Sequence, residues 1–164
     1  DPLPLDEHDA DHLDRLGGAA VIVVTNSDHV RDAATLARRT GARVLGPRGE
    51  RDGLPLPCDG WLGDGDEVVP GLRALEMEGS KTPGELALHL DGDTLVTGDL
   101  IRAHAGGSLC LLPDAKLGDR DRAIASVRRV MALPELRAVL TGDGWPVFRD
   151  ARTVLAELLA DLEA

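Results

Sequence analysis

Aromatic residues are almost missing from this chain of 164 residues, which has two tryptophans, one phenylalanine and no tyrosine. Proteins that bind single-stranded nucleic acid by stacking its bases need a platform of such rings, so the composition argues against this class of function. The hydrophobic fraction is nevertheless 43%, enough for a folded core. We therefore expect a core built from leucine, valine, alanine and isoleucine.

Cysteine, long apolar runs and positive charge are also scarce. Cys58 and Cys110 are far apart and lack the short spacing of a disulfide scaffold or a zinc knuckle, which fits a reduced, cytoplasmic setting. No apolar run approaches the roughly 20 residues that span a bilayer, and no signal-peptide pattern is present. The formal net charge of −11 opposes binding to phosphate backbones and anionic membranes. We therefore predict neither a nucleic-acid partner nor a membrane partner.

The first part of the chain has the pattern of an α/β unit. Acidic residues followed by Gly17-Gly18 predict a short helix over 6–16. The apolar, β-branched run 19–25 predicts a strand buried on both faces. A helix over 30–40, with a stop at Gly41, and a strand over 43–46 follow. A loop at the carboxyl end of the first strand is then the expected place for a site.

The remainder of the chain mixes short strands and two further helices. A hairpin turn is predicted at 91–93. The expected strands cover 71–78, 85–90, 94–97, 108–112 and 136–141, and the expected helices cover 120–133 and 147–162. The pattern therefore indicates a single α/β domain over residues 1–164 with mixed strands.

Five short motifs follow one another in a fixed order, most of them where a predicted strand ends. Such exits converge at one edge of a layered α/β fold and form a cleft there. The motifs are Thr25-Asn26-Ser27-Asp28-His29, Gly79-Ser80-Lys81-Thr82-Pro83-Gly84, Thr97-Gly98-Asp99, Leu109-Cys110-Leu111-Leu112-Pro113 and Thr141-Gly142-Asp143-Gly144-Trp145.

The order and spacing of these motifs resemble the metallo-β-lactamase fold superfamily. Its members usually carry His-x-His-x-Asp-His, then His-Ser/Thr-Pro-Gly, then Gly-Asp, then Gly-His-Gly. The resemblance covers nearly the whole chain and implies an αββα sandwich. It also implies that the first strands of the domain are missing before Asp1-Pro2, which matches the exit of such a strand.

The resemblance assigns the usual metal ligands residue by residue. The three histidines of the first metal fall on Val24, Asn26 and Lys81. Valine cannot ligate and a protonated lysine repels a cation, so we expect the first metal site to be absent. The ligands of the second metal fall on Asp28, His29, Asp99 and Asp143.

Two interpretations of this pocket stay open. In the first, those four residues hold one Zn, Mn or Fe ion that activates water. Asp28 or Asp99 would then take the proton, and Lys81 would bind the developing oxyanion. In the second, no metal is bound, and the ammonium of Lys81 lies among Asp28, Asp99 and Asp143 in place of the cation. Carboxylates this close cannot all stay ionised without such a counter-charge.

Three neighbouring residues complete the candidate pocket. Asn26 either shapes the first loop or contacts the substrate. Arg102, three residues after Asp99, either binds an anionic substrate or pairs with the acidic residues. Trp145 either lines the cleft or packs in the core.

The two interpretations predict different classes of protein. The first predicts a hydrolase of a small ester, thioester or phosphoester, and the second a non-catalytic binding or structural protein. Each has a small molecule as its partner. A sheet edge left unpaired would also favour a homodimer.

Overall fold

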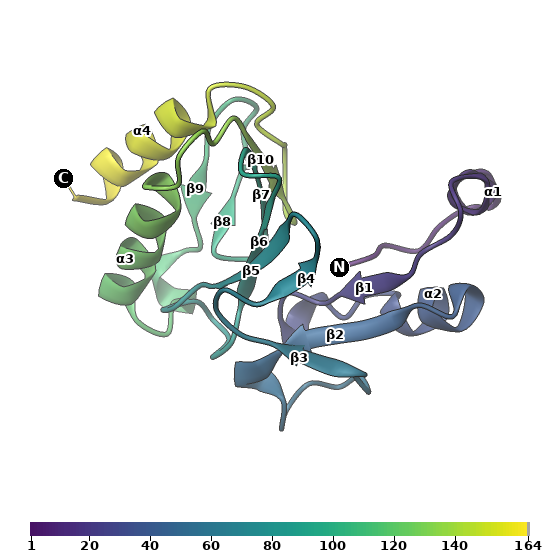
Figure 1. Ribbon diagram of the computed structural model, residues 1–164. Coiled ribbons are helices and arrows are strands. Elements are labelled where there is room, and N and C mark those ends of the chain that lie inside the picture. Colours follow the sequence, from purple (N-terminus) through teal and green to yellow (C-terminus); the bar gives the residue numbers. More distant parts are fainter. Residues whose placement is uncertain (164) are drawn as a thin grey trace.

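The computed structural model describes residues 1–163 as two β-sheets packed face to face with helices on both outer faces (Figure 1). Helices α3 (Arg120–Met131) and α4 (Ala151–Glu163) cover the larger sheet. Helix α2 (Ala33–Thr40) covers the smaller sheet, and α1 (Glu7–Arg15) lies beside α2, where Arg39 pairs with Asp14 at 2.7 Å. The predicted αββα order is therefore confirmed.

The smaller sheet has three parallel strands in the order β1-β2-β3. They are β1 (Val21–Val23), β2 (Arg43–Pro47) and β3 (Gly60–Leu62). Strand β1 is shorter than the predicted 19–25, and its residues alternate between buried and partly buried. The expectation of a strand buried on both faces was therefore wrong. Strand β1 forms one edge of this sheet, so its outer side packs against less protein.

The larger sheet has five strands in the order β10-β7-β6-β5-β4. Strands β4 to β7 form an antiparallel meander, and β10 returns to pair parallel with β7. A short antiparallel pair, β8 with β9, lies next to it. The bounds are β4 (Glu67–Val69), β5 (Leu72–Glu76), β6 (Leu86–Leu90), β7 (Thr94–Thr97), β8 (Ile101–Arg102), β9 (Cys110–Leu111) and β10 (Ala138–Thr141).

Alternation along strand β6 shows how the layers are held together. Leu86 and Leu88 pack between the two sheets, whereas Ala87 faces the layer of α3 and α4. Buried aliphatic side chains form both layers, as the composition predicts, and each buried leucine, valine or isoleucine contributes about 1.5–3 kcal/mol on burial. Phe148 and Trp145 remain 70% and 65% exposed, so neither belongs to the core.

Two predicted helices begin later than their patterns indicated. Val147 exchanges two backbone hydrogen bonds of 2.8 Å with Val139, so this segment stays extended and α4 begins at Ala151. The first loop forms a 3-10 turn, η1 (Ser27–His29), and Arg31 then adopts a left-handed φ of 44°. Because that φ interrupts a right-handed helix, α2 begins only at Ala33. None of the helices within residues 1–163 combines the length and apolarity needed to cross a membrane.

Candidate functional site

The predicted strand exits meet at the edge where the two sheets join. The backbone nitrogen of Leu86 donates to the carbonyl of Thr25 at 2.9 Å, which ties the larger sheet to the loop after β1. Gly142 donates to Thr97 at 2.9 Å, which sets the loop after β10 against the loop after β7. The structure therefore brings together the loops that carry the four predicted metal ligands.

Asn26 builds the first loop. It is fully buried, and its Oδ1 accepts a hydrogen bond of 3.0 Å from the backbone of Asp28, which caps η1. The next backbone nitrogen, that of Ser27, donates to the buried carboxylate of Glu50 at 2.8 Å. These contacts support the loop-shaping alternative for Asn26 and fix the direction in which His29 leaves the backbone.

His29 lies between two carboxylates. Its Nδ1 is 3.1 Å from Asp1 Oδ2 and its Nε2 is 3.3 Å from Asp99 Oδ1, and all three side chains are about nine-tenths buried. Asp1 is itself fixed by the hydroxyl and the backbone nitrogen of Thr25, both at 2.7 Å. Each ring nitrogen of His29 therefore faces one carboxylate oxygen. The hydrogen bond from His29, helped by Arg102 and opposed by burial, lowers the pKa of Asp99 to about 2.

Arg102 lies between two of the predicted metal ligands. Its guanidinium is 2.8 Å from Asp99 Oδ1 and 2.8 Å from Asp143 Oδ2, and its side chain is only 12% exposed. The second alternative proposed for Arg102, pairing with the acidic residues, matches this geometry. The bridge also joins β8 to the loop after β10.

Lys81 has a smaller role than the sequence suggested. Its ammonium pairs with Asp28 at the surface, and this hydrogen bond raises the pKa of Lys81. Among residues 1–163, no ion pair joins Lys81 to Asp99 or Asp143. The expectation that the ammonium lies among all three carboxylates is therefore corrected, because the guanidinium of Arg102 already lies 2.8 Å from both Asp99 and Asp143.

Arg31 is a site residue that the sequence analysis missed. Its Nη2 donates to the carbonyl of Gly142 at 2.8 Å and lies 3.5 Å from His29 Nε2. Its Nη1 contacts the carbonyl of Asp1 at 3.4 Å. The only feature of the sequence that could have indicated this role is the position of Arg31 two residues after His29. With Lys81 and Arg102, it gives the site three cationic side chains.

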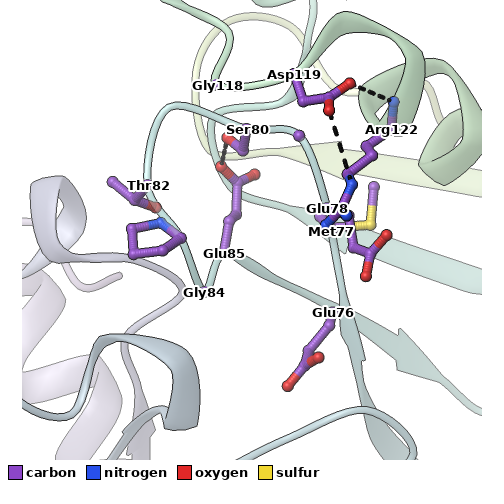
Figure 2. A pocket seen from close by; sticks show the side chains of 12 residues that line it. Glu76, Met77, Glu78, Ser80, Thr82, Gly84, Glu85, Gly118, Asp119 and Arg122 are labelled. Carbon is purple, nitrogen blue, oxygen red and sulfur yellow. Dashed lines mark hydrogen bonds and ion pairs between the residues drawn. The ribbon is translucent and has the colours of Figure 1, made fainter.

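Glu85 is a second missed residue and lies beneath the loop that carries Lys81 (Figure 2). It is 1% exposed; its carboxyl is hydrogen-bonded to the hydroxyl of Ser80 and accepts from the backbone of Leu100 at 2.8 Å. Burial raises the pKa of Glu85 to about 7, although both hydrogen bonds act in the opposite direction. Glu85 thus fastens the loop of Lys81 to the loop of Asp99.

A cavity of about 710 Å³ adjoins the charged residues. The charged residues Asp1, Arg31 and Asp143 are among those that line it. Its walls include the apolar side chains of Val23, Leu88, Val96 and Leu140. Trp145 is not among the residues that line this cavity, so its contact with a ligand stays a prediction.

A family model described as the metallo-beta-lactamase superfamily matches residues 1–162. The chain belongs to the metallo-β-lactamase superfamily. Curated relatives include a hydroxyacylglutathione hydrolase of Cereibacter sphaeroides, 34% identical over 121 residues, which are 71% of this chain and 44% of that protein. Another, from Rhizobium meliloti, is 30% identical over 140 residues, which are 80% and 51%. The chain spans about half the length of these relatives.

Solved structures agree with this fold. A protein crystallised in a di-iron-bound form superposes with a TM-score of 0.71 at 22% identity, covering 96% of this chain and 85% of its own. A metallo-beta-lactamase from Pontibacter korlensis gives 0.70 at 16% identity, covering 96% and 77%. At these identities the likeness extends to the fold alone.

The residues at this superfamily site do not fit a divalent ion. Within residues 1–163, the only three His, Cys, Asp or Glu side chains with ligand atoms within 4.8 Å of one another are exposed, at the start of α1: Asp6, His8 and Asp9. At the site itself, Asn26 Nδ2 and Arg102 Nε are buried without a hydrogen-bond partner. Both are N–H donors, which need an acceptor oxygen, whereas a metal needs lone pairs. The three carboxylates that would bind an ion are also already paired with cationic side chains, Asp28 with Lys81 and the other two with Arg102.

Proposed function

We propose that this member of the metallo-β-lactamase superfamily is a metal-independent, non-hydrolytic binding protein. The observation that carries the proposal is the bridge from Arg102 to Asp99 and Asp143, two contacts of 2.8 Å made by a side chain that is 12% exposed. A metal ion on those carboxylates would have to displace a nearly buried guanidinium.

The charges at the site support the same proposal. Asp28 pairs with Lys81, and Asp99 and Asp143 share Arg102, while Arg31 supplies a third positive charge beside His29. A divalent ion about 4 Å from one guanidinium would meet a repulsion of about 8 kcal/mol at an effective dielectric constant of about 20. The carboxylates are already neutralised by their cationic partners, so their attraction for a metal ion would offset little of this repulsion.

The ligand that we propose is a small molecule with an apolar body and a polar end. The volume of the adjoining cavity lies in the range of small-molecule sites, and its lining combines apolar side chains with the charged side chains of Arg31 and Asp143. The apolar part would displace water from the walls. The polar end would be oriented by the charged groups.

Elemental analysis by mass spectrometry tests the absence of metal. The protein is purified without chelator, with Asp28→Ala and a buffer blank alongside. We expect neither protein to carry Zn, Mn or Fe above the blank. About one ion per chain, lost in Asp28→Ala, would overturn the proposal.

A hydrolase that uses one metal ion is the second candidate. Two observations favour it: the curated relatives are hydroxyacylglutathione hydrolases at 30–34% identity, and His29 lies 3.3 Å from Asp99 in this chain. Thioester hydrolysis is measured after addition of Zn, Mn or Fe in turn. Metal-dependent turnover that Asp99→Asn abolishes would establish this candidate and exclude the first.

A further inference from the structure

We infer that Arg31 and Arg102 together close a latent metal site, in which two guanidinium groups occupy the places of a cation at His29, Asp99 and Asp143. This inference rests on the proposed metal-independent function. It goes further by naming the two residues that exclude the ion, and by predicting that their removal creates a metal-binding protein.

The backbone of Arg31 is the first support. Its φ of 44° is a left-handed value that favours glycine. A long side chain persists in such a conformation only where its surroundings fix it, and such residues cluster at functional sites. The surroundings here are the carbonyls of Gly142 and Asp1, at 2.8 Å and 3.4 Å from the guanidinium.

The direction of the Arg31 side chain is the second support. Its Nη2 lies 3.5 Å from His29 Nε2, the same ring nitrogen that faces Asp99 at 3.3 Å. A metal ion bound through His29 and Asp99 would need the lone pair of that nitrogen. The guanidinium of Arg31 therefore covers the histidine side of the site.

Arg102 covers the carboxylate side independently of Arg31. It contacts Asp99 and Asp143 from β8, whereas Arg31 reaches the site from the loop after η1. Without the two arginines, the site would present one imidazole and the carboxylates of Asp99 and Asp143, with Asp28 at its rim. Such a donor set suits Zn or Mn.

The test measures metal binding by the full chain and five variants. Arg31→Gly introduces the residue that the left-handed backbone conformation favours. Arg102→Gln removes the positive charge and keeps a polar side chain, and a third variant combines both substitutions. Arg120→Gln is the matched control, because Arg120 pairs with Asp114 at the surface, where the two side chains are 47% and 69% exposed. The fifth variant adds Asp99→Asn to the combined one.

Equilibrium dialysis with Zn²⁺, and visible absorption with Co²⁺, report the binding. We expect no saturable binding by the wild type or Arg120→Gln. We expect about one ion per chain in the combined variant, with a rise in Tm by mass action. Addition of Asp99→Asn should abolish that binding.

The alternatives are distinguishable. A combined variant that keeps its near-ultraviolet circular dichroism and binds no metal overturns this inference and leaves the proposed function intact. Stoichiometric binding by the wild type overturns both. If the combined variant does not fold, Arg31→Gly alone must bind Co²⁺ at least about tenfold more tightly than the wild type, a difference of 1.4 kcal/mol. No gain in that variant overturns the inference.

Discussion

Replacement of Glu85 by glutamine should stabilise the protein at neutral pH but not in mild acid. The carboxyl of Glu85 is almost fully buried, and its pKa is raised from 4.5 to about 7. Between these two values the folded chain keeps the proton and the unfolded chain releases it. The free energy of unfolding therefore falls as the pH rises from 4.5 to about 7.

The size of this loss follows from the shift in pKa. Each pKa unit corresponds to about 1.4 kcal/mol, so the group destabilises the wild type by about 3 kcal/mol above pH 7 relative to mild acid. Glutamine cannot ionise, and it can retain both hydrogen bonds. Its amide oxygen accepts from Leu100, and its NH₂ group donates to the hydroxyl of Ser80, the two partners that Glu85 has now.

The assay is urea unfolding followed by circular dichroism at several pH values from 4.5 to 8. We expect Glu85→Gln to match the wild type near pH 4.5 and to exceed it by about 3 kcal/mol at pH 8. That gain corresponds to roughly 6–12 °C in Tm for a domain of this size. Glu67→Gln, at an exposed position on β4, is the control and should show a flat difference. A flat difference for Glu85→Gln would refute the reasoning.

Three further substitutions test the contacts at the site. Arg102→Ala should lower the free energy of unfolding by about 2–4 kcal/mol in urea unfolding, because it removes the guanidinium that pairs with the nearly buried Asp99 and leaves that carboxylate with His29 alone, whereas Arg120→Ala at the surface should cost less than about 1 kcal/mol. Lys81→Ala should leave Tm close to that of the wild type, since its ion pair is exposed; a large fall would contradict the division of charge described above. Gly98→Ala should cost about 1–3 kcal/mol, because its Cβ would lie 2.8 Å from a threonine hydroxyl, while Gly106→Ala, with open space around it, should be nearly neutral in the same thermal-melting measurement.

The pattern of the sequence predicted the layers of the fold because each element depends on near neighbours. Gly41 ends α2 with a φ of 73°, as its position after the apolar repeat indicated. The turn at 91–93 joins β6 to β7 as predicted. The start of α4 could not be predicted in this way, because it depends on the pairing of Val147 with Val139 on another strand.

The site was predicted in part for the same reason. His29 and Asp99 follow strand ends, so their meeting at 3.3 Å could be expected from the order of the motifs. The role of Arg31 could not, because it depends on the carbonyl of Gly142, 111 residues away. Glu85 lies within an apolar strand pattern, and only the packing of the two sheets makes its carboxyl a buried group. The homodimer stays a prediction, which sedimentation velocity would test.

The long sequence separation of the site bridges has a consequence for the kinetics of folding. Lys81 pairs with a residue 53 positions away, and Arg31 bonds to one 111 positions away. Closing such a long loop costs conformational entropy, and the contact stabilises the chain only after the intervening residues are ordered. We therefore expect substitutions in these bridges to accelerate unfolding more than they slow folding, because the bridges form after the transition state. Trp61 on β3 and Trp145 at the end of the last motif place one fluorescent residue on each side of the junction between the two sheets, so fluorescence can follow the formation of that junction.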